Sequence, residues 1–192
     1  MRDGEAAAGL DELEQQFASW FARLGLRHFE AHEVLGPVLE DGRRKWPMPE
    51  PLHWDNAIAP LIVLDALREE LGEPVVIIAG NRTEEYNAAL KGSSPVSQHL
   101  AFRAFDFYTR QKVRAYELLL AWQGRIFEAP VEIMPAQRLL SDGKTFVPYK
   151  SLQLWDQRGG ESTVFRYAGG VGIYPWGLHA DSRGYRAKWD FR

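Results

Sequence analysis

Two histidines and two aspartates have the residue types and spacing that could build a metal site. His99 comes just before a predicted strand over 102–108, and Asp106 lies within that strand. Much later in the chain, His179 and Asp181 are separated by one residue, so in an extended segment their side chains project from the same face. Two imidazoles and one carboxylate suit Zn²⁺, and three protein ligands leave a fourth position open for water. These residue types are therefore compatible with a catalytic metal site.

The same residues also have simpler interpretations. A histidine ahead of a strand commonly caps the strand or forms a hydrogen bond within the core, and this applies to His99. Asp106 can form an ion pair with Arg103 or Arg110 without any metal. Residue spacing alone leaves these alternatives open.

The pattern of apolar residues predicts the elements that must position these side chains. Helical spacing predicts helices over 11–24, over 58–71, after an N-cap at Thr83, and after an N-cap at Thr109. The β-branched run 75–78 predicts a buried central strand. Further strands are expected near 102–108, 131–134, 151–155, 164–167, 171–174 and 178–181. Because helices come early and strands late, we expect an α+β fold with a largely antiparallel sheet flanked by helices.

Composition limits the domain count and the classes of partner. A chain of 192 residues, 45% of them hydrophobic, fits one domain, which we expect over 11–192 after a loose tail over 1–10. A net charge of −3 makes nucleic acid an unexpected partner, and the absence of cysteine excludes zinc fingers and thiol proteases. No uninterrupted apolar stretch predicts a membrane span, and the N-terminus shows no signal peptide. The oligomeric state is left open.

The candidate metal ligands belong to a longer set of motifs. In chain order these are Arg82-Thr83-x-x-x-Asn87, Ser97-x-His99, Ala104-x-Asp106, Gly169-Gly170-Val171-Gly172-x-Tyr174, His179-x-Asp181 and Arg186-x-x-Trp189. As an ordered set they resemble the zinc D-Ala-D-Ala peptidases that share a fold with the Hedgehog signalling domain, over about residues 28–189. The glycine-rich motif itself predicts a tight turn or a strand bend near the site.

The resemblance implies a ligand set and a fold. It identifies His99, Asp106 and His179 as the ligands of one Zn²⁺ per chain, and it implies a Hedgehog/DD-peptidase-like fold. Zinc held in this way would lower the pKa of its bound water towards ~7 and polarise a scissile carbonyl.

Roles beside the metal also follow from the resemblance. Arg82 matches an arginine that stabilises a developing oxyanion or holds a substrate carboxylate, as a guanidinium fork can do. The structural alternative is a helix-start arginine paired with Glu84 or Glu85. We expect Ser97 and Tyr174 beside the substrate, with Ser97 supporting the site by a hydrogen bond; packing alone is the alternative for Tyr174.

The chain departs from the family pattern in two places, and the second concerns the general base. Phe102 stands where the family usually has glycine. Trp176 and Gly177 occupy the positions at which these peptidases often carry a glutamate or a further histidine as base. Asp181 is then the best remaining carboxylate to orient or deprotonate water, and its alternative role is to accept a hydrogen bond from an imidazole N–H.

The sequence thus predicts a zinc metallopeptidase that hydrolyses peptidoglycan stem-peptide bonds by metal-activated water. Either a D-Ala-D-Ala carboxypeptidase or a crosslink endopeptidase fits. A non-catalytic zinc-binding recognition or structural module of the same fold is the first alternative. A metal-free structural domain, for instance in a phage particle, is the second. The substrate class implies a periplasmic or extracellular site of action, whereas the lack of a visible signal peptide leaves a phage-encoded or cytoplasmic origin open.

Overall fold

The computed structural model describes residues 3–42, 44–129, 138–139, 145–146 and 163–192. Within them the helices are α1 (Asp3–Ala22), α2 (Ala31–Leu35), α3 (Ile58–Leu71), α4 (Glu84–Ala89) and α5 (Lys112–Ala121), with the 3₁₀ helices η1 (Pro51–Ala57) and η2 (Gln98–Ala101). The strands are β1 (Val76–Ala79), β2 (Ala104–Tyr108), β3 (Ile126–Ala129), β4 (Arg138–Leu139), β5 (Thr145–Phe146), β6 (Thr163–Arg166), β7 (Gly170–Ile173), β8 (Leu178–Asp181) and β9 (Ala187–Asp190). The strands predicted over 131–134 and 151–155 lie outside the described residues.

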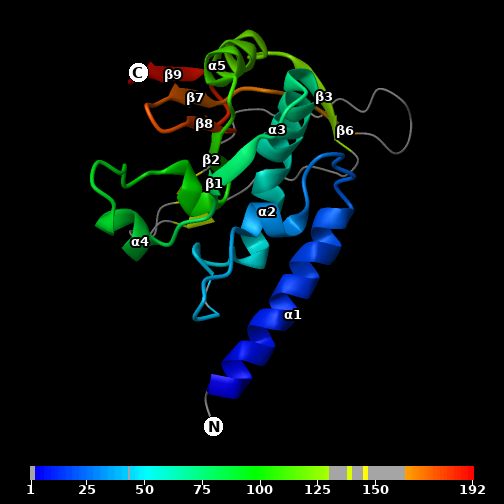
Figure 1. Ribbon diagram of the computed structural model, residues 1–192, viewed down its shortest axis with the longest axis vertical. Helices are drawn as coiled ribbons and strands as arrows, with labels where there is room; N and C mark the ends of the chain where they lie inside the picture. Colours follow the sequence, from blue (N-terminus) through cyan, green and yellow to red (C-terminus); the bar gives the residue numbers. More distant parts are fainter. Residues whose placement is uncertain (1–2, 43, 130–137, 140–144, 147–162) are drawn as a thin grey trace.

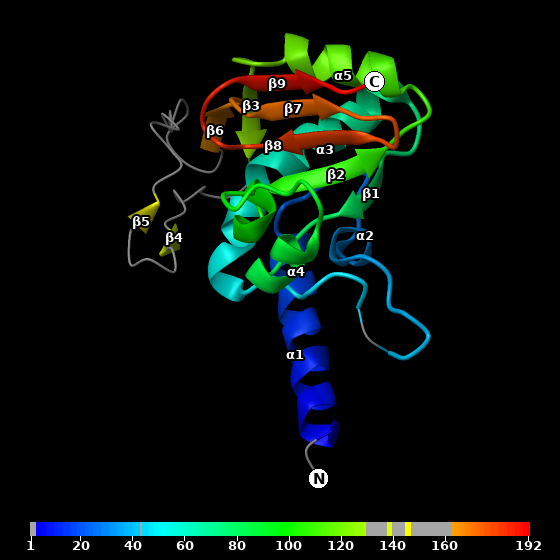
Figure 2. The same ribbon diagram turned by 90° about the vertical axis from the view of Figure 1, so that its left-hand side faces the viewer.

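The main sheet has the strand order β1-β2-β8-β7-β9. Its neighbours are antiparallel except for β7 and β9, which run parallel. Two small antiparallel pairs, β3 with β6 and β4 with β5, stand apart from it. Helices flank the main sheet in both views (Figures 1 and 2). The predicted α+β class with a largely antiparallel sheet flanked by helices is therefore confirmed.

The two faces of the central strands carry different chemistry. One face belongs to a buried apolar cluster shared with α3 and α5, with Phe105, Phe107, Val171, Ile173, Leu178 and Ala180 as its strand members. Helix α3 passes behind the sheet in Figure 2. Because strand side chains alternate, the intervening positions point to the other face. Those positions are Asp106, Gly172, His179 and Asp181, so the polar candidates share one face of the sheet.

Strand β1 differs from its prediction as a buried central strand. It pairs only with β2 among the described strands, so it forms an edge of the sheet. Val76 is 49% exposed, whereas Ile77 is buried. A β-branched run favours a strand, but its place in the sheet depends on which partners the rest of the chain supplies.

Two helices near the site form as the sequence predicts. Helix α3 ends at Leu71, and Gly72 follows in the left-handed conformation with φ of 63°, donating its N–H to Arg68 and Glu69. Glycine adopts this conformation without the strain of a side chain, which gives a regular helix end. Helix α4 begins after Thr83, whose hydroxyl accepts a hydrogen bond from the backbone N–H of Tyr86 at 3.1 Å.

Two other helix starts differ from the prediction. Helix α1 begins at Asp3 and reaches into the segment predicted as a tail; it projects away from the sheet in Figures 1 and 2. Helix α5 begins at Lys112, because the Thr109 hydroxyl donates to Glu73 instead of capping the helix. The division into a tail over 1–10 and a domain over 11–192 stays a prediction. No helix in the described part of the chain is both long and apolar enough to cross a membrane.

Candidate metal centre

Three side chains from distant parts of the chain converge on the polar face of the sheet. Asp106 on β2 and His179 on β8 are direct partners in the antiparallel register, so their side chains emerge next to each other. His99 approaches from η2, immediately before β2. One ligand atom from each of the three residues lies within 4.8 Å of the others, and all three residues are buried. This group can hold a metal ion.

The short helix η2 turns into β2 through a left-handed residue that positions His99. That residue is Phe102, with φ of 52° and ψ of 35°, and its N–H caps the helix by donating to Gln98 and His99. Glycine adopts a positive φ without strain, so the glycine expected here from the resemblance would fit this conformation. In this chain the Phe102 ring is fully buried against Phe17 and Phe105, and this packing offsets the backbone strain.

His99 has the protonation pattern of a metal ligand. Its Nδ1 lies 2.6 Å from the carbonyl oxygen of Gly80, which can only accept, so Nδ1 carries the proton. Its buried Nε2 lies 3.3 Å from Asp106 Oδ1 and makes no hydrogen bond within the described residues. Burial lowers the pKa of His99, which favours the neutral ring. A neutral imidazole with a lone pair directed at a carboxylate fits a metal ion.

His179 is held between two carboxylates. Its Nδ1 lies 2.8 Å from Asp106 Oδ1 and its Nε2 lies 2.9 Å from Asp181 Oδ2. Burial acts to lower the pKa of the ring, but the hydrogen bonds with both aspartates outweigh burial and raise the pKa to about 9. The ring is therefore oriented with Nδ1 on the side of Asp106 and His99.

Asp181 lies behind His179, away from solvent. Its carboxylate is 0% exposed and accepts hydrogen bonds from the backbone N–H groups of Gly170 (2.8 Å) and Arg183 (3.1 Å). The Arg183 guanidinium adds bonds of 3.0 Å from Nε and 2.5 Å from Nη2. Burial acts to raise the pKa of Asp181, yet His179 and Arg183 hold it well below its usual range. This setting favours the role of acceptor for an imidazole N–H over that of a base for water.

Arg82 is tied to the same group by its side chain and its backbone. Its Nη2 donates to Asp106 Oδ2 at 2.6 Å, and its backbone N–H donates to the carbonyl of His99 at 3.2 Å. Arg82 immediately precedes Thr83, the N-cap of α4, so the start of this helix fixes the backbone position of Arg82. A cation thus lies at the exposed margin of the buried ligands.

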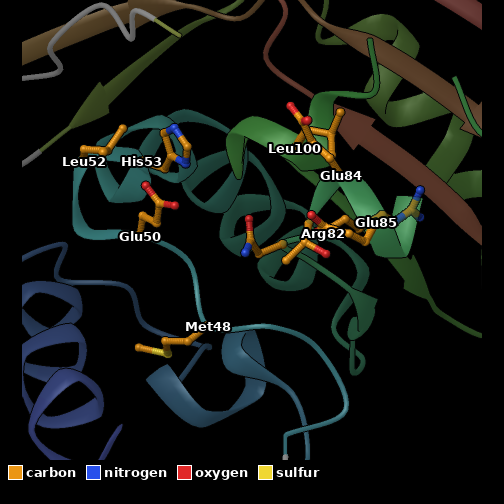
Figure 3. A pocket seen from close by; sticks show the side chains of 10 residues that line it. Met48, Glu50, Leu52, His53, Arg82, Glu84, Glu85 and Leu100 are labelled. Carbon is orange, nitrogen blue, oxygen red and sulfur yellow. The ribbon is translucent and has the colours of Figure 1, made fainter. Parts of the chain in front are cut away.

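A pocket of about 460 Å³ opens beside this arginine. Figure 3 shows Glu50, Leu52 and His53 on one side of it and Arg82, Glu84, Glu85 and Leu100 on the other. Arg82 links this pocket to the candidate metal centre, because it lines the pocket and donates to Asp106; His99, Asp106 and His179 are not among the residues that line it. A substrate in this pocket would lie next to Arg82.

The two remaining predicted site residues, Ser97 and Tyr174, differ in how they relate to the three candidate ligands. Ser97 stands before η2, and within the described residues no hydrogen bond joins its hydroxyl to the three ligands. Tyr174 accepts a hydrogen bond from Trp189 Nε1 at 2.5 Å, and the Trp189 ring lies 5.2 Å from that of His179. Tyr174 also stacks on the exposed ring of Trp176, with centroids 4.6 Å apart.

The structure adds contributors that the sequence reasoning did not identify. Arg183 and the Gly80 carbonyl hold Asp181 and His99, respectively. The glycine-rich motif leaves room for a neighbouring ring, which is not the predicted turn or bend: a side chain at Gly172 would collide with the indole of Trp189. For Arg183 a signal was present, because it follows Asp181 at the same two-residue spacing by which Asp181 follows His179. Nothing in the sequence points to a backbone carbonyl.

Comparison with known proteins agrees with this geometry. Residues 43–125 match the family model described as Peptidase M15. The match includes Arg82, His99 and Asp106, and His179 lies beyond it. No curated protein and no solved structure matches the chain. The family is zinc-dependent, which agrees with the buried group of two histidines and one aspartate. The match supports membership of this chain in the M15 family of zinc D-Ala-D-Ala carboxypeptidase-like peptidases.

Proposed function

We propose that the chain is a zinc-dependent peptidase that hydrolyses stem-peptide bonds of peptidoglycan, as a D-Ala-D-Ala carboxypeptidase or a crosslink endopeptidase. The observation that carries the proposal is the convergence of His99, Asp106 and His179, with His99 Nε2 buried, unprotonated and without a hydrogen bond in the described part of the chain. The family match supports the peptidase class.

His99, Asp106 and His179 would hold one Zn²⁺ per chain. Bound there, zinc would lower the pKa of a coordinated water towards ~7 and polarise the carbonyl under attack. The protein's own contribution is orientation: the Gly80 carbonyl fixes the His99 ring and Asp181 fixes the His179 ring. Hydrogen bonds of this kind raise the basicity of the ligand and set its tautomer.

Arg82 would act on the substrate side. It lines the pocket and donates a hydrogen bond to Asp106, so its side chain lies between the pocket and this ligand. A guanidinium is always charged and forks onto paired oxygens, which suits a substrate carboxylate or a developing oxyanion. For Arg82→Lys we expect activity to fall by about 10²–10³-fold with zinc content unchanged.

Two measurements test the proposal. Metal analysis of the purified protein should give about one zinc per chain, and His99→Ala should lose it. His32→Ala is the matched control, because that histidine is exposed and outside the group. Incubation with muropeptides, followed by mass spectrometry, should show loss of D-Ala or opening of crosslinks. Wild-type protein without zinc contradicts the proposal.

A second candidate function is a zinc-binding recognition module without catalysis. Two observations favour it: Trp176 and Gly177 replace the usual base, and the Asp181 carboxylate is buried among hydrogen-bond donors. Bound zinc without hydrolysis of any muropeptide would establish it. If hydrolysis is found, single replacement of the exposed pocket glutamates by glutamine tests them as the base; these are Glu50, Glu84 and Glu85.

A further inference from the structure

Arg183 holds the carboxylate of Asp181 with a planar fork. Its Nε lies 3.0 Å from both carboxylate oxygens and its Nη2 lies 2.5 Å from Oδ2. The backbone N–H of Arg183 adds a bond of 3.1 Å to Oδ1. Several donors in a fixed geometry prevent the carboxylate from rotating, which a single hydrogen bond would not achieve.

The surroundings of the pair are shaped to fit it. A Cβ at Gly170 would lie 2.5 Å from Asp181 Oδ2 and 2.8 Å from Arg183 Nη2, so any side chain there would displace the pair. The Gly170 N–H itself donates to Asp181 Oδ1 at 2.8 Å. On its other side the guanidinium lies over the ring of Trp189, 5.3 Å from its centroid. The fork is thus confined between a bare backbone and an aromatic ring.

We propose that Arg183 is a positioning residue for the candidate metal centre. By gripping Asp181 it fixes the hydrogen bond to His179 Nε2, and so keeps Nδ1 of that ring turned toward Asp106. The inference rests on the proposed function, because it takes His179 as a zinc ligand. Replacing groups that orient a metal ligand typically costs about 10–100-fold in metal affinity.

The chain contains its own control for this proposal. Arg192 grips Asp190 with the same set of atoms: Nε at 3.0 and 3.1 Å, Nη2 at 2.6 Å and the backbone N–H at 3.1 Å. That pair is exposed, and none of its hydrogen bonds in the described structure involves a histidine. Comparing variants of Arg192 and Arg183 can therefore separate the loss of an arginine–aspartate pair as such from the loss of a contact that orients His179.

The test measures zinc affinity by competition with a chromophoric chelator, and the visible absorption of the Co²⁺-substituted protein. Arg183→Met should weaken zinc binding about 10–100-fold and change the Co²⁺ spectrum, because the geometry of His179 is relaxed. Arg183→Lys keeps the charge without the fork and should give a smaller loss. Arg192→Met should leave both readouts at wild-type values.

The outcomes separate this inference from the function on which it rests. Zinc binding by wild type that is unchanged in Arg183→Met overturns the inference and leaves the zinc site standing. Absence of zinc binding by wild type overturns the proposed function, and the inference with it. Thermal unfolding of each metal-free variant checks the fold. If Arg183→Met does not fold, Arg183→Lys decides, and wild-type affinity in that variant overturns the inference.

Discussion

Two Asp-x-Arg segments lie at the C-terminal ends of two strands of the same sheet, and their local geometry is nearly the same. Asp181 with Arg183 lies at the end of β8, and Asp190 with Arg192 lies at the end of β9. In each, the arginine closes onto the aspartate two residues earlier with Nη2 at 2.5 or 2.6 Å. Their burial differs: Asp181 is 0% exposed, whereas the side chains of Asp190 and Arg192 are 42% and 47% exposed.

The difference shows that spacing alone sets the contact, while the environment sets its role. Alternation along an extended chain brings residues two apart to one side, and that is enough to form either pair. In water such a pair contributes little, because solvent and salt screen both charges. Behind His179 the same pair is desolvated, so each partner depends on the other and on the imidazole.

Replacement of each aspartate in turn tests whether burial distinguishes the two pairs, and it should give the largest difference in stability. Asp181→Ala should lower the free energy of unfolding by about 3–5 kcal/mol, because it leaves the charge of Arg183 without its buried partner. Asp190→Ala should cause no measurable change. Urea denaturation of the metal-free proteins provides the measurement. Equal effects of the two substitutions would show that burial does not distinguish the pairs.

A smaller effect is expected from filling the space beside the buried pair. Gly170→Ala should destabilise the protein by about 1–3 kcal/mol, because the new methyl group overlaps Asp181 and Arg183. Zinc affinity should fall in the same variant as the pair moves. Denaturation and chelator competition measure the two effects, and wild-type values in both would mean that the glycine is not needed for the pair.

A smaller loss of stability than that of Gly170→Ala is expected from Trp189, on the strand that carries the exposed pair. On β9, Trp189 lies next to Asp190 but faces the site, where its indole N–H donates to the hydroxyl of Tyr174. Trp189→Phe should lower the free energy of unfolding by about 0.5–1.5 kcal/mol, the usual net value of one hydrogen bond. Thermal and urea unfolding measure this. A loss as large as that of Asp181→Ala would show that Trp189 supports the buried pair more than its ring contact implies.

The sequence predicted the candidate metal ligands better than it predicted the residues that hold those ligands in place. The spacing of His179 and Asp181 on one strand is a local property, and the structure has both on one face. The hydrogen bonds from Arg183 to Asp181 follow the same alternation. How much they contribute to the site depends on their burial, which residue spacing does not reveal. For Asp181 the sequence left two roles open, and the donors around its carboxylate favour one of them.

Errors of prediction arose where a distant residue competes with a local preference. Thr109 has the chemistry of a helix cap, but Glu73 takes its hydroxyl and α5 starts at Lys112. The β-branched residues before Gly80 predict a strand correctly, but β1 lies at the edge of the sheet. Local propensity carries no information on which strand pairs next to it.

The sequence by itself determined the local elements and the candidate ligands: the helix ended by Gly72, the cap at Thr83, and the ordered set of His99, Asp106 and His179. Tertiary structure decided how these ligands meet and what holds them. The register of β2 with β8 sets Asp106 against His179, and the Gly80 carbonyl sets the proton on His99. Short-range order follows from the backbone and neighbouring side chains, whereas pairing, burial and tautomer depend on residues far away in the chain.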